Sequence, residues 1–258
     1  MALSEQSTQL TTRKERRYEA REAKILSVAR ALLRDHGLAE LTMDRIADAI
    51  NYSKAVVYQH FPCKEEIVLA LATQTALLRL KLHERVLQFK GNSRERIIAS
   101  GEATVVLQAD HLQCELITLT NAFASKTSET RLRLYQRTTS KTIVTASAIV
   151  KEAVAAGDLS LPEGLNAEAF IFSLWATIFG GFCLLFSGAN LFDPGPSFKE
   201  QGTPENVHLV RMCGRGLLDG YGWRPLSTEW DYRETMRRIY REVFPAEVIR
   251  ELSTYGTP

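Results

Sequence analysis

The stretch NYSKAVVYQHFPCKEE, residues 51–66, combines two kinds of side chain in a helical pattern. Val57 and Phe61 are four residues apart, so they share one face of a helix and favour a hydrophobic core. Tyr58 and Gln59 lie between them, with polar ends that favour water or a polar partner. The helix is therefore expected to pack on one side and to present a polar surface on the other.

Residues 42–61 show the pattern of one short helix, a tight turn and a second short helix. Thr42 can cap the first helix through its hydroxyl, and Asn51 tolerates the left-handed backbone that ends it. Ser53 can cap the second helix, and Pro62 ends it. Two helices joined by a turn of about three or four residues form a helix-turn-helix unit, whose second helix enters the DNA major groove. The polar face of the second helix would then read DNA.

The sequence LTMDRIADAINYSKAVVYQHFPCKEEIV, residues 41–68, resembles the N-terminal domain of TetR-family transcriptional regulators. The resemblance covers about residues 20–70 and includes the preceding ILSVARALLRDHGLAELT. In the turn, Asn51 and Tyr52 stand where the family usually has Gly-Val, and Cys63 replaces the usual capping serine. The family's motif is matched at Thr42, Ile46, Ala47, Ser53, Lys54, Tyr58, Phe61, Lys64 and Glu65.

This resemblance implies a set of DNA contacts. Thr42 and Lys64, at helix N-termini, are expected to bind phosphates. Lys54 and Gln59 are the candidates for base edges, because Gln can pair with adenine and Lys with guanine. Tyr58 and His60 would contact the DNA backbone. Arg45 could contact either the DNA backbone or a base edge. The full set of expected DNA-binding residues is Thr42, Arg45, Ser53, Lys54, Ala55, Tyr58, Gln59, His60 and Lys64.

The rest of the chain has helical rather than alternating periodicity, which predicts an all-α fold. A first helix, ended by Gly37, would complete a three-helix head, and a C-terminal helical bundle would follow it. We expect a flexible basic arm over residues 1–20, a DNA-binding domain over 21–66 and a helical domain over 67–258. Further helices are predicted at about 64–89, 93–110, 112–124, 128–156, 166–188, 205–221 and 229–243, with a Pro/Gly-rich loop at 193–206.

Charge and cysteine usage agree with a reduced, cytoplasmic protein that has an anionic partner. The net charge is +2, and residues 1–64 hold 11 Lys/Arg against 8 Asp/Glu, which is +3. A solvated face explains this excess almost as well as DNA does. The four cysteines lie far apart without metal-binding spacing, and the N-terminus lacks the apolar core of a signal peptide. No metal or cofactor is expected.

A segment without any charge, residues 169–192, has three interpretations. It carries an aromatic stripe at helical spacing: Phe172, Trp175, Phe179, Phe182 and Phe186. The stripe can be core or a dimer seam, the wall of an effector pocket, or part of a membrane span. The packing interpretation is favoured, because apolar stripes most often serve packing, and the pocket wall comes second. The membrane span comes last, because the family resemblance and the lack of a cationic anchor downstream both argue against it.

The resemblance also implies a homodimer that binds a palindromic operator and a small-molecule effector. Its half-sites would lie about 34–36 Å apart. An apolar or aromatic effector is expected, with Arg131, Arg133 and Arg137 either pairing with an anionic group or simply solvated. The pocket residues expected from family position and the stripe are Leu119, Phe123, Tyr135, Trp175 and Phe179.

The predicted function is a DNA-binding regulator, most often a repressor in this family, released by its ligand. An activator, or a regulator without a ligand, is the alternative. An enzyme is disfavoured, because the chain lacks GxSxG, P-loop, GxGxxG and HExxH motifs. A membrane-associated interaction protein that uses 169–192 is a third possibility. Residues 223–258 can pack across a dimer, cover the ligand entrance or bind another protein.

Overall fold

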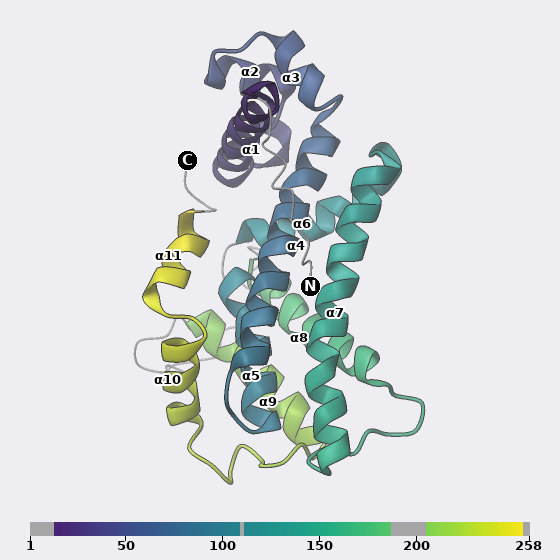
Figure 1. Ribbon diagram of the computed structural model, residues 1–258, viewed down its shortest axis with the longest axis vertical. Coiled ribbons are helices and arrows are strands. Elements are labelled where there is room, and N and C mark those ends of the chain that lie inside the picture. Colours follow the sequence, from purple (N-terminus) through teal and green to yellow (C-terminus); the bar gives the residue numbers. More distant parts are fainter. Residues whose placement is uncertain (1–12, 109–110, 187–204, 255–258) are drawn as a thin grey trace, which may run out of the picture. The chain divides into compact units, whose positions relative to one another are not determined.

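The computed structural model describes residues 13–108, 111–186 and 205–254, and every regular element within them is a helix (Figure 1). This confirms the predicted all-α class. The chain divides near residue 67 into two compact units. Helix α4 (Lys64–Gln88) contributes its first residues to the N-terminal unit and continues into the second.

The N-terminal unit contains α1 (Arg13–Glu40), α2 (Met43–Ile50) and α3 (Lys54–His60). Its core is built from the apolar positions that the helical periodicity picked out. Ile25, Leu33, Ile46, Val57 and Phe61 are each almost completely buried. One face of α3 therefore packs against both preceding helices.

Around the turn between α2 and α3, the predicted cap at Thr42 and the predicted left-handed end at Asn51 are present, but the predicted side-chain cap at Ser53 is not. The Arg45 backbone N–H donates to Thr42 Oγ1 at 3.2 Å, which caps α2. Asn51 ends α2 in the left-handed conformation, with φ 56°. Ser53 precedes α3 with extended backbone, but its side chain makes no capping hydrogen bond. Gly37 interrupts α1 with φ 74°, a conformation that suits glycine.

The N-terminal arm differs from its prediction in the part that the structure describes. Helix α1 begins at Arg13, so residues 13–20 extend the first helix and do not form a flexible arm. Once a helix is nucleated, each added residue gains a hydrogen bond at small cost, and polar residues can prolong it. The rest of the expected arm, residues 1–12, lies outside the described residues.

The second unit contains most of α4 and the remaining helices. These are α5 (Ser93–Gln108), α6 (His111–Phe123), the short 3₁₀ helix η1 (Ala124–Lys126), α7 (Glu129–Ala156), α8 (Ala167–Phe186), α9 (Glu205–Gly220), α10 (Tyr232–Glu242) and α11 (Ala246–Thr254). The predicted helices agree with these to within a few residues, but α11 was not expected. Most of the predicted loop 193–206 lies outside the described residues.

Helix α8 packs against α5, α7 and α9 within the second unit. Gly181 permits the close approach of α9, because a Cβ there would lie 3.1 Å from Val210 Cγ2. Gly180, next to it, has open space on its side. One of the two glycines therefore serves packing within the chain.

The C-terminal segment from Trp223 onward packs into the core of its own chain. Trp223, Ile239 and Phe244 are almost fully buried. The guanidinium of Arg94 in α5 donates to the Trp223 carbonyl at 2.8 Å. Figure 1 shows α10 and α11 in yellow along one side of this unit. The segment is thus an integral part of the second unit.

Candidate DNA interface and ligand cavity

Helix α3 presents a polar surface opposite the face that it buries. Lys54, Ala55, Tyr58 and Gln59 are exposed, and the Tyr58 side chain is 49% accessible to solvent. Val57, on the opposite side, is inaccessible. Such a helix is fixed in place by its apolar face. Its exposed amide, ammonium and phenol groups can form the contacts that recognise bases in the DNA major groove.

The other expected DNA contacts lie around this surface within the same unit. Arg45 and Ser53 are exposed, and Thr42 and Lys64 are half-buried at the N-termini of α2 and α4. The unpaired N–H groups of a helix N-terminus favour anions such as phosphate.

Two of the expected cations are paired with carboxylates. Lys54 Nζ lies 2.7 Å from Asp44 Oδ2, and Arg45 pairs with Glu40. The hydrogen bond and negative charge of Asp44 raise the pKa of Lys54. All four side chains are well exposed, and exposed pairs contribute little to stability. Phosphate or base acceptors can therefore replace the carboxylates.

His60 does not have the position that a DNA contact requires. Its ring is buried, and its centroid lies 4.0 Å from that of the Tyr18 ring in α1. His60 Nδ1 lies 3.8 Å from Glu22 Oε2. The side chain thus joins α3 to α1, and we correct its expected role from DNA contact to packing.

The turn itself is held by α1. Lys24 Nζ donates to the Ile50 carbonyl at 3.5 Å and lies 5.3 Å from the centroid of the Tyr52 ring. Tyr52 is consequently half-buried rather than free in solvent. The unusual Asn-Tyr in this turn is accommodated by a neighbouring cation.

The sequence profile of "Bacterial regulatory proteins, tetR family" matches residues 25–71. The match begins in α1 and includes α2, the turn, α3 and the start of α4. Over these residues the chain is therefore similar to the N-terminal domain of the TetR family. Uncharacterised HTH-type transcriptional regulators of Mycobacterium bovis and Mycobacterium tuberculosis are 43% identical to it over 53 residues. The aligned stretch covers 20% of this chain and 26% of those relatives.

Solved structures, including two TetR-family regulators, share the fold over most of the chain. A TetR/AcrR-family regulator of Thermobifida fusca superposes with a TM-score of 0.56 at 22% identity, over 78% of this chain and 98% of that one. PfmR of Thermus thermophilus gives 0.55 at 16% identity, over 76% and 97%. SmeT, the repressor of a Stenotrophomonas maltophilia multidrug efflux pump, gives 0.54 at 20%, over 83% and 98%. The resemblance therefore extends to the second unit at the level of fold.

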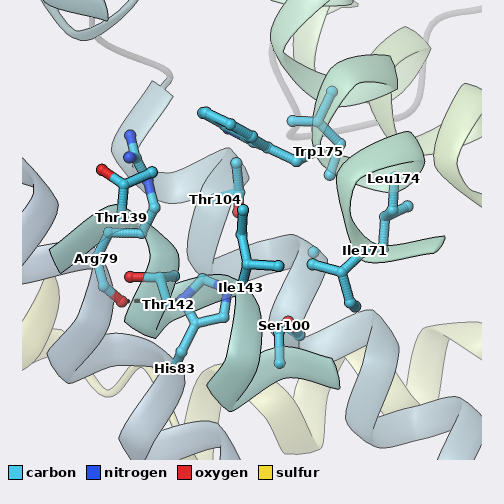
Figure 2. Close-up of a pocket in the computed structure, with 13 residues that line it drawn as sticks. Arg79, His83, Ser100, Thr104, Thr139, Thr142, Ile143, Ile171, Leu174 and Trp175 are labelled. Carbon is cyan, nitrogen blue, oxygen red and sulfur yellow. Dashed lines mark hydrogen bonds between the residues drawn. The ribbon is translucent and has the colours of Figure 1, made fainter. Parts of the chain in front are cut away.

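The second unit contains a cavity between four helices (Figure 2). Arg79 and His83 come from α4, Ser100 and Thr104 from α5, Thr139 and Thr142 from α7, and Ile171, Leu174 and Trp175 from α8. The empty space between these side chains is about 450 Å³, including the part open to solvent. Its walls are mostly apolar, with hydroxyls and one guanidinium at intervals.

The expected pocket residues are only partly in this cavity. Trp175 lines it. Tyr135 is a neighbour, because Arg79 and Thr139 act on its phenol; burial raises the pKa of Tyr135, and these two groups oppose the shift. The Phe179 ring centroid lies 6.3 Å from that of Trp175. Leu119 and Phe123 are not among the residues that line this cavity.

Arg79 and His83 were missed by the sequence reasoning, although their positions carry a signal. Ala72, Ala76 and Val86 share one buried face of α4, and Arg79 and His83 fall on that same face. An arginine within an apolar stripe is unusual, because a buried charge needs compensation. This interruption could have identified the cavity.

The aromatic stripe on α8 has both buried and exposed members. Phe182 is buried in the core, whereas Phe172 and Leu184 are 57% and 62% exposed. Helix α8 is also long and apolar enough to cross a membrane by length and composition, with a mean hydropathy of 2.1 over its most apolar window. A core helix of a soluble protein passes the same test.

The described residues contain no group of three or more His, Cys, Asp or Glu side chains placed to hold a metal ion. The four cysteines are free thiols.

Proposed function

We propose that this chain is a cytoplasmic, sequence-specific DNA-binding transcriptional regulator and that α3 is its recognition helix. The observation that carries the proposal is the two-sided character of α3, which buries Val57 and Phe61 and exposes Lys54, Tyr58 and Gln59. The match of residues 25–71 to the TetR family supports the same assignment. Regulation through DNA binding is favoured over catalysis.

The proposed regulator acts as a homodimer on a palindromic operator. The exposed apolar side chains of α8, Phe172 and Leu184, supply a surface that water does not favour. A second copy of the chain would cover it, and a two-fold dimer would present two α3 helices to two half-sites. A dimer interface would explain the exposed apolar side chains of α8 without a membrane to cover them.

Repression with release by a small molecule is the favoured mode of action. The cavity between α4, α5, α7 and α8 provides a place for the ligand. SmeT, which shares the fold, is described as a repressor. Activation, or regulation without a ligand, remains the second candidate.

Salt dependence of DNA binding tests the proposed interface. Lys54→Ala and Lys64→Ala should each weaken binding to duplex DNA, and Lys64→Ala should reduce the slope of log affinity against log salt by about 1, since one phosphate contact is lost. Lys141→Ala, on the exposed surface of α7, is the matched control and should change neither quantity. Equal behaviour of all three variants would contradict the assignment of the interface.

A further inference from the structure

Arg79 is a buried cation whose hydrogen-bonding groups are not all used. The residue is 5% exposed, and neither Nε nor Nη2 has a hydrogen-bond partner among the residues that the structure describes. Burial lowers the pKa of Arg79, but a guanidinium stays protonated in proteins. Buried charges are normally paired, because an unpaired one is costly. Within the described ranges, the guanidinium of Arg79 therefore lies in the cavity wall without a carboxylate counter-charge.

Trp175, across the cavity on α8, adds a second unused donor. Its indole Nε1 is buried and also has no hydrogen-bond partner in the described part of the chain. Arg79 Cζ lies 5.9 Å from the centroid of the Trp175 ring, which orients the guanidinium without using either N–H. Figure 2 shows the two side chains facing the same space. The unused groups, Nε and Nη2 of Arg79 and Nε1 of Trp175, are all donors, so they lack an acceptor.

The titratable neighbours of Arg79 do not supply that acceptor as an anion. His83 Nδ1 lies 2.9 Å from the Arg79 backbone carbonyl, so Nδ1 carries the proton. Burial lowers the pKa of His83 to about 4, and the ring is neutral at neutral pH. Burial raises the pKa of Tyr135, so its phenol is neutral too. The third neighbour, Cys114, is a buried thiol. Arg79 alone is charged among the described residues that line the cavity.

The other residues of the cavity wall determine which uncharged part of a ligand fits. Ile143, Ile171, Leu174 and Ile178 give an apolar surface, which favours aliphatic or aromatic groups. The hydroxyl of Thr142 donates to the Thr138 carbonyl at 3.1 Å, so it is occupied by its own helix. A molecule that is anionic at one end and apolar elsewhere satisfies both parts of the wall.

We propose that the effector is a small carboxylic acid with an apolar or aromatic body, whose carboxylate accepts hydrogen bonds from Arg79 and Trp175. This inference rests on the proposal that the chain is a ligand-responsive regulator, and it names the chemical class of the ligand. Arg79 supplies the charge, and Trp175 supplies both a donor and an aromatic wall. A guanidinium suits a carboxylate because it can donate two parallel hydrogen bonds.

Calorimetric titration of the full chain with matched pairs of compounds tests this inference. Benzoate, phenylacetate and octanoate are each compared with the corresponding neutral amide. At least one acid should bind about tenfold or more tightly than its amide, because hydrogen bonds to a charged group are the stronger ones. Binding of no acid, or equal binding of every acid and its amide, would overturn the proposal.

Three variants assign the effect to the cavity. Arg79→Met should abolish the preference for the acid without unfolding the protein, since replacing an unpaired buried charge by an apolar chain removes a cost. Trp175→Phe keeps an aromatic ring but removes the indole N–H donor. This variant should weaken binding of the acid more than binding of the amide. Arg137→Met, on the exposed surface of α7, is the matched control and should bind as the wild type does. A preference for the acid that survives Arg79→Met would also overturn the proposal.

DNA affinity, measured with and without the acid, separates this proposal from the proposed function. Binding of the acid with unchanged DNA affinity supports the carboxylate site and contradicts release by ligand. If the chain binds DNA but none of the acids, the proposed carboxylate site is overturned. The proposed DNA-binding function is unaffected by that result.

Discussion

At the scale of single residues, Val57 and Gln59 show how a seven-residue helix serves two purposes. Val57 is inaccessible to solvent, and Gln59, two positions on, is exposed. The spacing of apolar residues predicted this division, because it depends only on helical geometry. His60 was misplaced for the opposite reason: its partners, Tyr18 and Glu22, come from distant positions in the sequence.

Gln59→Ala tests base reading at one residue. We expect the variant to lose discrimination at one base-pair position of its preferred site, at a cost of about 1–3 kcal/mol. Competition titrations with single-base variants of the site measure this. Gln88→Ala, an exposed position at the end of α4, serves as the control. Unchanged discrimination at every position would remove Gln59 from the interface.

His83 is expected to make folding sensitive to mild acid. Its folded pKa is about 4, below the value of about 6.5 for an unfolded histidine. The unfolded state therefore binds the proton first, and stability is lost as pH falls through this window. Between pH 7 and pH 5 the contribution is about 2 kcal/mol. Urea unfolding should show this loss in the wild type and a smaller one in His83→Gln; identical losses would contradict the burial of a neutral His83.

At the scale of elements, α10 is attached to α5 by buried polar groups. Glu95 accepts from Thr235 Oγ1 at 3.0 Å and from Arg238 Nη1 at 2.8 Å. Glu102 accepts from both Nε and Nη2 of Arg211 in α9, at 2.8 and 2.7 Å. These contacts explain why the C-terminal segment belongs to the core.

Glu102→Gln tests this attachment. Burial and the charge of Glu102 raise the pKa of Tyr240, whose hydroxyl donates to Glu102 at 3.1 Å. Removing the carboxylate leaves Arg211 without its counter-charge in a largely buried position, which should cost about 3 kcal/mol or more in the free energy of unfolding. Chemical denaturation measures the loss.

The control for this prediction is the ion pair between the half-buried Arg96 and the exposed Glu152. Glu152→Gln should cost less than about 1 kcal/mol, because solvent screens the pair. Similar costs for the two variants would mean that burial does not strengthen the Glu102 contacts.

Helix existence was predictable from periodicity, and some helix ends were predictable from caps. Gly157 ends α7 with φ 80°, as its position after the apolar pattern indicated. The start of α1 and the presence of α11 were missed. Helix α11 follows Pro245 directly and buries Val248, so the sequence did carry a signal for it. Most of the residues that line the cavity were missed because they come from four helices, whose packing is a property of the whole domain.

At the scale of the whole molecule, the proposed function requires two copies of the chain. The exposed apolar positions of α8 are the candidates for the contact between them. Two-fold symmetry would place one recognition helix in each of two successive turns of the major groove. Quaternary structure and DNA recognition are thus linked in the proposed function.

Leu184→Arg tests the dimer. Leu184 is 62% exposed, so the substitution should leave the folded monomer intact while placing a charge in the proposed seam. Sedimentation should show monomers, and DNA affinity should fall. Leu134→Arg, at a position 51% exposed on α7, is the matched control and should remain dimeric. A Leu184→Arg variant that stays dimeric would place the seam elsewhere.

Selection of bound sequences from random duplex DNA by the purified protein tests the central claim most directly. The account predicts enrichment of a palindromic site with half-sites about 34–36 Å apart, as expected for two recognition helices on one face of the duplex. Binding that enriches no sequence, and that weakens with salt alike for every duplex, would contradict the assignment of α3 as a recognition helix.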